Sequence, residues 1–206
     1  MSRPVPRFHA ITGASLGLRH ADIAEWAAEG GADLIQFRDK QIGIREFIQE
    51  GEKARNAAKR HGALFIVNDR VDAALALNAD GVHLGQTDMP ASAARRLMGA
   101  EALIGVTAPT VELAKQAQQD GADYVGFGPI FGTRSKPDAR APVGVEGLRD
   151  YCAAVSLPVI AIGGIRADVV PALLEAGADG IAALSAVSRA DDVREAARAF
   201  ARCFVK

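Results

Sequence analysis

Residues 66–90 read IVNDRVDAALALNADGVHLGQTDMP and contain two short apolar runs separated by a segment that can hold two turns of helix. The runs are Ile66–Val67 and Gly81–Leu84, and polar residues follow each of them directly. One carboxylate lies just beyond each run, Asp69 after the first and Asp88 after the second. The stretch therefore predicts two neighbouring strands that each lead into an aspartate.

These two aspartates are candidate ligands for Mg²⁺. That ion prefers hard oxygen ligands, takes few of them from protein, and keeps positions for water and substrate phosphate. Aspartate is also common as a turn residue and as a helix N-cap, and these are the alternative interpretations of Asp69 and Asp88 respectively. Neither aspartate alone distinguishes a metal ligand from a turn residue or a helix N-cap.

An internal repeat, Gly/Asn-Ala-Asp, organises the chain. Each copy follows a helical pattern and precedes an apolar run (LIQF, GVHL, YVGFG or GIAAL), so its first residue suits a left-handed helix end. The copies are Gly31–Asp33, Asn78–Asp80, Gly121–Asp123 and Gly177–Asp179. Four further apolar runs lie between them: Phe8–Thr12, Leu64–Val67, Leu103–Val106 and Pro158–Ile162.

Eight candidate strands thus alternate with helical patterns, of which 44–60 and 193–204 are the clearest because their apolar residues share one face. Pro90 suits the first turn of another helix. This order predicts an α/β fold: one (β/α)₈ TIM barrel of parallel strands covering residues 1–206. A doubly wound open sheet is the alternative, but no Gly-x-Gly-x-x-Gly follows the first strand.

Composition narrows the class of protein. The formal net charge of −1 argues against a nucleic-acid footprint, and no apolar run is long enough to span a membrane. Residues 1–12 lack the apolar segment of a secretory leader. Cys152 and Cys203 have neither metal-ligand spacing nor a disulfide framework. We expect a cytoplasmic protein with reduced thiols; a homo-oligomer is compatible with the sequence.

Active-site groups of a barrel lie at the carboxyl ends of its strands, and several polar residues fall there. Alternation places Gln36, Arg38 and Lys40 on one side of the second strand end, as a candidate phosphate clamp; a solvated charged edge is the alternative. The segment 131–145 is long enough for a lid, although a merely flexible loop is equally compatible with it. Gly163-Gly164 can bring backbone N–H groups close to a phosphate.

The histidines suggest no catalytic constellation. His83 is predicted to be a hydrogen-bonded interior residue, and His9, His20 and His61 have no clear constellation. No Ser/His/Asp or Cys/His arrangement points to nucleophilic hydrolysis. Carboxylates, cations, hydroxyls and glycines at the strand ends instead suit two phosphorylated groups, one of them bridged by a divalent metal.

Five segments carry a family resemblance: QFRDK (36–40), VNDR (67–70), DGVHLGQTDMP (80–90), GPIFGTRSK (128–136) and AIGGI (161–165). In this order, over nearly the whole chain, they resemble the thiamine-phosphate synthase family. The block at 80–90, with Asn68–Asp69 before it, is specific, whereas AIGGI is shared by many phosphate-binding barrels.

The resemblance implies a transferase with two small-molecule substrates. It joins 4-amino-2-methyl-5-pyrimidinylmethyl diphosphate to 4-methyl-5-(2-phosphooxyethyl)thiazole, or the carboxylated form of that thiazole. Thiamine phosphate and pyrophosphate are the products. The family is understood to react dissociatively, through a pyrimidinylmethyl cation, with Mg²⁺ as the cofactor. This chemistry needs positioning and charge stabilisation rather than a strong base.

The resemblance also implies roles for individual residues. Asp69 and Asp88 hold Mg²⁺. Three further groups contact the substrates: Arg38, Lys40, Asn68 and Lys136 at the diphosphate, with Lys136, Arg38 and Lys40 as the catalytic cations; Gln36 and Thr107 at the pyrimidine; and Thr133, Ser135, Gly164, Ser185 and the Leu184 backbone at the thiazole phosphate.

The chain departs from the family pattern at four positions. Thr107 stands for a usual Ser, Ser135 for Thr and Asp39 for Glu, and Pro109 stands where relatives often carry His. That His is the catalytic residue expected in the sister thiazole tautomerases, and proline cannot transfer a proton. The synthase is therefore favoured over two alternatives, a tautomerase-like isomerase and a non-catalytic protein that binds thiamine phosphates.

Overall fold

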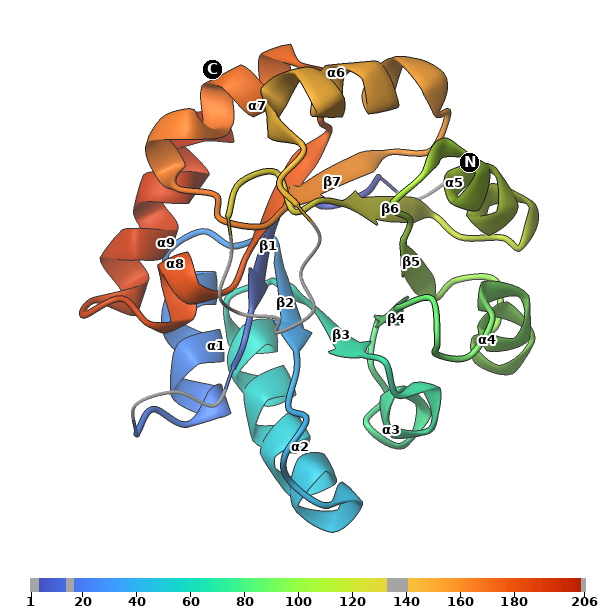
Figure 1. Ribbon diagram of the computed structural model, residues 1–206. Helices are drawn as coiled ribbons and strands as arrows, with labels where there is room; N and C mark the ends of the chain where they lie inside the picture. Colours follow the sequence, from blue (N-terminus) through green and yellow to red (C-terminus); the bar gives the residue numbers. More distant parts are fainter. Residues whose placement is uncertain (1–3, 14–16, 133–140, 205–206) are drawn as a thin grey trace.

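The computed structural model describes residues 4–13, 17–132 and 141–204. Within these residues eight parallel strands close into a barrel in chain order, and β8 pairs with β1. Figure 1 shows the helices surrounding the ring of strands. The predicted (β/α)₈ barrel is confirmed, and the alternative of an open sheet is wrong because the β1–β8 pairing leaves no open edge.

The strands agree with the predicted apolar runs to within one residue at either end. They are β1 (Phe8–Ile11), β2 (Leu34–Phe37), β3 (Leu64–Asn68), β4 (Gly81–Leu84), β5 (Leu103–Thr107), β6 (Tyr124–Phe127), β7 (Val159–Ile162) and β8 (Gly180–Ala183). Side chains that alternate along a strand face either the helices or the barrel interior, so this agreement also sets which residues face inward.

The helices cover the outside of this ring. They are α1 (His20–Glu29), α2 (Ile44–Arg60), α3 (Val71–Ala76), α4 (Ala91–Met98), α5 (Val111–Gln119), α6 (Gly144–Ala154), α7 (Val170–Glu175), α8 (Ser185–Ser188) and α9 (Val193–Ala201), with short 3₁₀ helices η1 (Ala167–Val169) and η2 (Arg202–Phe204). Pro90 is the N-cap of α4 and does not lie in its first turn as predicted. None of the described helices has the length and apolar character needed to cross a membrane.

The Gly/Asn-Ala-Asp repeat lies at the amino-terminal ends of the barrel strands, where each copy binds the preceding strand. The first residue of every copy has a positive φ, as the helix-end prediction requires: Gly31 (101°), Asn78 (46°), Gly121 (83°) and Gly177 (103°). The aspartate of every copy accepts a hydrogen bond from a backbone N–H near the start of the preceding strand: Asp33 from Phe8 (2.9 Å), Asp80 from Phe65 (2.8 Å), Asp123 from Ile104 (2.7 Å) and Asp179 from Val159 (2.8 Å). We call these contacts the four aspartate clasps.

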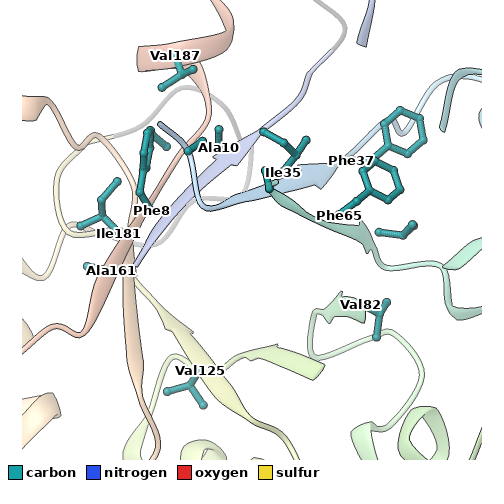
Figure 2. Packing of buried hydrophobic residues seen from close by; sticks show 14 of the residues in the cluster. Phe8, Ala10, Ile35, Phe37, Phe65, Val82, Val125, Ala161, Ile181 and Val187 are labelled. Atoms are coloured by element: carbon teal, nitrogen blue, oxygen red, sulfur yellow. The ribbon is translucent and has the colours of Figure 1, made fainter. Parts of the chain in front are cut away.

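Two apolar layers hold the barrel together. Figure 2 shows the outer layer, in which side chains such as Phe37, Phe65 and Val82 project from the strands toward the helices. The inner layer fills the barrel itself: Ile11, Leu34, Ile66, Leu103, Tyr124, Ile160 and Ala182. Gly105 makes room for the Tyr124 ring, because a Cβ there would lie 2.0 Å from the tyrosine Cζ. The interior is therefore a packed core, and the free space for chemistry lies at the rim.

Candidate active site

The predicted site residues within the described chain lie at or just beyond the carboxyl ends of the strands. Asn68 is the last residue of β3 and is aligned with His83 of β4, while Thr107 ends β5. The carboxyl ends of parallel strands meet at one rim of a barrel. The rim opposite the aspartate clasps is thus where these polar groups gather.

Asp69 and Asp88 come together beside a lysine at this rim. Lys40 Nζ lies 3.1 Å from Asp69 Oδ2, and the Gly85 N–H donates to Asp88 Oδ2 at 2.6 Å. Burial raises the pKa of Asp88; the Gly85 N–H lowers it, the neighbouring Asp69 carboxyl raises it, and the net shift is upward. Because the Asp69 carboxyl disfavours the charged form of Asp88, the pair forms a site that favours a further positive ligand.

The structure also bears on the alternative roles of these aspartates. Asp69 does occupy a turn, with φ of 65°, and its N–H donates to the His83 carbonyl at 2.8 Å. Asp88 is not a helix N-cap, because Pro90 holds that position at α4 and the Asp88 carboxylate binds Gly85 instead. The backbone at Asp69 is therefore held in an uncommon left-handed conformation that aims its carboxylate across the rim.

This donor set fits Mg²⁺. Within the part of the chain that the structure describes, no group of three or more His, Cys, Asp or Glu side chains comes together to form a metal cage. Asp69 and Asp88 supply carboxylate oxygens, and the remaining positions would fall to water and substrate phosphate. This arrangement suits an ion that bridges a protein to a diphosphate better than it suits a structural metal.

The end of β2 places its three predicted residues in different surroundings. Gln36 is 3% exposed and faces the barrel interior. The strand ends at Phe37, so alternation does not orient Arg38 and Lys40, which lie in the β2–α2 loop. Lys40 nevertheless reaches Asp69, and the Arg38 backbone N–H donates to Thr12 Oγ1 at 3.2 Å. The loop is thus tied to β1 on one side and to the carboxylates on the other.

A hydrogen-bonded chain leads from the barrel interior to Thr107. His83 Nδ1 lies 3.0 Å from the Tyr124 hydroxyl and His83 Nε2 lies 2.9 Å from Thr107 Oγ1, which confirms the predicted interior histidine. Burial raises the pKa of Tyr124 far above its ordinary value, so the phenol keeps its proton. With Tyr124 donating to Nδ1 and Nε2–H donating to Thr107, the threonine hydroxyl hydrogen is left to face a ligand.

The paired glycines after β7 serve the packing of the chain itself. Gly163 and Gly164 have φ of 101° and 66°, and a Cβ on either would lie 2.5 Å from an atom of the β6–α6 loop (Pro129 Cβ and Gly132 O respectively). Phe131 N–H donates to the Gly163 carbonyl at 2.9 Å. Both glycines are therefore packed closely against residues 129–132.

The remaining predicted residues belong to the last strand and to the segment after β6. Leu184 directly follows β8, and Ser185 begins α8 at the same rim. Thr133, Ser135 and Lys136 lie outside the described residues, as does most of the predicted lid at 131–145.

The sequence interpretation missed one buried network. His20 shows no clear constellation in the sequence, yet its Nδ1 lies 2.8 Å from Thr12 Oγ1 and its Nε2 lies 2.9 Å from Asp39 Oδ2. The three residues come from the end of β1, the start of α1 and the β2–α2 loop. No local spacing connects them, so only the fold brings them together.

A closed barrel with carboxylates, cations and hydroxyls at the carboxyl ends of its strands defines a (β/α)₈-barrel enzyme. Its rim is suited to anionic small molecules. Residues 8–187 match the family model described as thiamine monophosphate synthase, and the chain belongs to this family.

Individual relatives agree with this assignment. Thiamine-phosphate synthase of Chloroflexus aurantiacus is 50% identical over 194 residues, covering 93% of this chain and 89% of that protein. Its counterpart in Moorella thermoacetica is 50% identical over 177 residues, covering 86% and 84%. The solved structure of thiamine phosphate pyrophosphorylase from Pyrococcus furiosus has a TM-score of 0.87 and 41% identity, covering 96% of this chain and 94% of that one. The family resemblance read from the sequence is confirmed.

Proposed function

We propose that this chain is a thiamine-phosphate synthase that joins a pyrimidinylmethyl diphosphate to a thiazole phosphate and releases pyrophosphate. Family membership carries the overall reaction. The location of the active site is supported by one observation: Lys40, Asp69 and Asp88 meet at one rim of the barrel. A diphosphate together with a divalent cation complements this mixture of positive and negative groups.

The reaction breaks the bond between the pyrimidinylmethyl carbon and a diphosphate oxygen, and it forms a bond from that carbon to the thiazole nitrogen. The electron pair of the broken bond leaves with pyrophosphate, so negative charge grows on the leaving group. We assign to Arg38, Lys40, Asn68 and Lys136 the stabilisation of this negative charge. No general base is needed, because the nitrogen lone pair makes the new bond; preorganised charge and positioning lower the barrier.

We assign Mg²⁺ to Asp69 and Asp88. The raised pKa of Asp88, caused by burial and by the adjacent Asp69, supports this assignment because a divalent cation relieves both effects. Bound there, Mg²⁺ would neutralise charge on the departing pyrophosphate.

The two organic substrates divide the rest of the rim. Gln36 and Thr107 are assigned to the pyrimidine, and the hydrogen bond from His83 to Thr107 supports this by orienting the hydroxyl. Gly164, Leu184 and Ser185 are assigned to the thiazole phosphate, with Thr133 and Ser135. Pro109, two residues beyond Thr107, has no proton to transfer, which supports a synthase over a tautomerase. Cys152 and Cys203 are free cysteines, which supports a reducing, cytoplasmic setting.

The test is a reaction of the purified chain with both substrates and Mg²⁺. We expect thiamine phosphate and pyrophosphate in equal amounts, and no product once the metal is chelated. Asp88→Asn should raise the Mg²⁺ concentration for half-maximal rate at least tenfold, since even groups behind a ligand affect metal affinity by roughly 10–100-fold. Calorimetric titration of Mg²⁺ in the presence of pyrophosphate measures the same loss without turnover.

Asp120→Asn is the matched control, because Asp120 caps the far end of α5 and is hydrogen-bonded by Gln116. It should behave as the wild type in both assays. Tight binding of thiamine phosphate without any turnover would replace the proposal with a binding protein. Metal-independent isomerisation of a thiazole phosphate that survives Asp88→Asn would replace it with an isomerase.

A further inference from the structure

A buried chain of hydrogen bonds runs beneath the loop that carries Arg38 and Lys40. Thr12 Oγ1 accepts from the Arg38 N–H at 3.2 Å and lies 2.8 Å from His20 Nδ1. His20 Nε2 lies 2.9 Å from Asp39 Oδ2. We call these three side chains the Thr12–His20–Asp39 network.

The other carboxylate oxygen of Asp39 extends the network past Lys40. Asp39 Oδ1 accepts from the Gln41 N–H at 2.7 Å and from the Ile42 N–H at 3.3 Å. Burial raises the pKa of Asp39, but the Gln41 N–H, His20 and the Ile42 N–H together hold the pKa below its ordinary value. The backbone is therefore bound on both sides of Lys40 by groups that are anchored to β1 and α1.

The order of these groups resembles a nucleophile, a base and an acid, but burial excludes that role. Thr12 is 0% exposed and His20 is 5% exposed, and the Asp39 side chain is 3% exposed. The Thr12 oxygen is already an acceptor for a backbone N–H, and no substrate can reach it. The His20 ring is also held edge-on against Phe37, with ring centres 4.8 Å apart. A satisfied, buried polar network of this kind acts by fixing one geometry.

We propose that Thr12, His20 and Asp39 are positioning residues that hold the β2–α2 loop in the conformation that presents Arg38 and Lys40 to the diphosphate. The inference rests on the proposed function of those two cations. The network binds the loop through the Arg38 N–H on one side and through Gln41 and Ile42 on the other, so the segment between these points has little freedom to turn away.

The test compares Thr12→Val with Thr12→Ser in the full chain. Valine keeps the shape of the side chain and removes its hydroxyl, whereas serine keeps the hydroxyl. For Thr12→Val we expect kcat/KM for the pyrimidine diphosphate to fall roughly tenfold or more, because small displacements of a positioning group have effects of this size. KM for the thiazole phosphate should change less than twofold, and Thr12→Ser should restore at least half of the lost kcat/KM.

A second measurement separates positioning from folding. The Kd of pyrophosphate in the presence of Mg²⁺, taken by calorimetry on samples with folded far-UV spectra, should rise in Thr12→Val and in His20→Leu. In an Arg38→Ala/Lys40→Ala background, Thr12→Val should raise this Kd less than twofold further, since both residues that the network positions are gone.

The outcomes separate a failure of this inference from a failure of the proposed function. Equal losses toward both substrates, or full additivity with the Arg38→Ala/Lys40→Ala pair, would assign the network to general stability and overturn the inference. If Arg38→Ala lowers kcat/KM while Thr12→Val does not, the inference alone fails. If Arg38→Ala has no effect, the assignment of the diphosphate site fails, and the inference fails with it.

Discussion

His9 should make the folded protein less stable in mild acid. The side chain is 1% exposed in the barrel interior, where its Nε2–H donates to the Pro6 carbonyl at 2.9 Å. Burial lowers the pKa of His9 to about 3; the bond to Pro6 raises it and the nearby His83 lowers it further. In the unfolded chain the pKa of a histidine is about 6.5. Below that pH the unfolded state therefore binds a proton at His9, while His9 in the folded state stays neutral.

This difference in pKa between the folded and unfolded states sets the sign and the size of the effect of His9 on the free energy of unfolding. The contribution of His9 to stability is complete above pH 6.5, falls by about 1.4 kcal/mol for each pH unit below it, and levels off near pH 3, where folded His9 also takes up a proton. At pH 5.0 the free energy of unfolding should therefore be lower by about 2 kcal/mol from this residue alone.

Urea unfolding at pH 7.5, 6.0 and 5.0 measures this effect in the wild type and in His9→Gln, whose amide can still donate to the Pro6 carbonyl. The wild-type free energy of unfolding should decline more steeply than that of the variant, by about 2 kcal/mol between the two end points. Ile11→Val, on the same strand and the same inner face, changes packing without removing the titrating ring and should keep the wild-type slope. Parallel pH dependence in the wild type and His9→Gln would refute the reasoning.

Three further predictions concern turnover and packing. Under the proposed assignment, Lys136→Ala should raise the barrier by about 2–4 kcal/mol with little change in Tm, because it removes a positive charge beside the leaving group; unchanged kcat would remove Lys136 from the site. Asp80→Ala should lower the free energy of urea unfolding by about 1–3 kcal/mol, because it leaves the buried Phe65 N–H without its acceptor, and an unchanged midpoint would contradict the clasp. Gly105→Ala should lower Tm by several degrees or prevent folding, since its methyl would meet the Tyr124 ring at 2.0 Å; calorimetry showing wild-type Tm would contradict this packing.

The barrel could be predicted because its strands are apolar on both faces. A parallel strand covered by helices outside and by a packed core inside is a continuous apolar run, and LFIV (64–67) and VIAI (159–162) have this character. The glycines and Asn78 at the ends of helices were equally predictable, because a positive φ restricts the residue type. These are local requirements, and local sequence carries them.

The features that the sequence could not predict depend on contacts between separate elements. Asp80 is an ordinary residue before a strand until the barrel brings the Phe65 N–H to it. His20 meets Asp39 because α1 and the β2–α2 loop converge. Gly163 and Gly164 indicate a turn in the sequence, and only the fold shows that residues 129–132 pack against them. In each case the sequence shows the type of residue, but only the fold shows which partner it contacts.

The aspartate clasps divide the ring into four modules. Each clasp joins an odd-numbered strand to the segment that leads into the next strand, so β1–α1–β2 is one module and β3–α3–β4 is the next. Neighbouring modules meet through main-chain bonds such as Leu64 N–H to the Asp33 carbonyl. New termini opened at the turn around Gly62, between α2 and β3, would leave every module contiguous. A break in the chain at this module boundary would lie at the end of the barrel opposite the rim that carries Asp69 and Asp88.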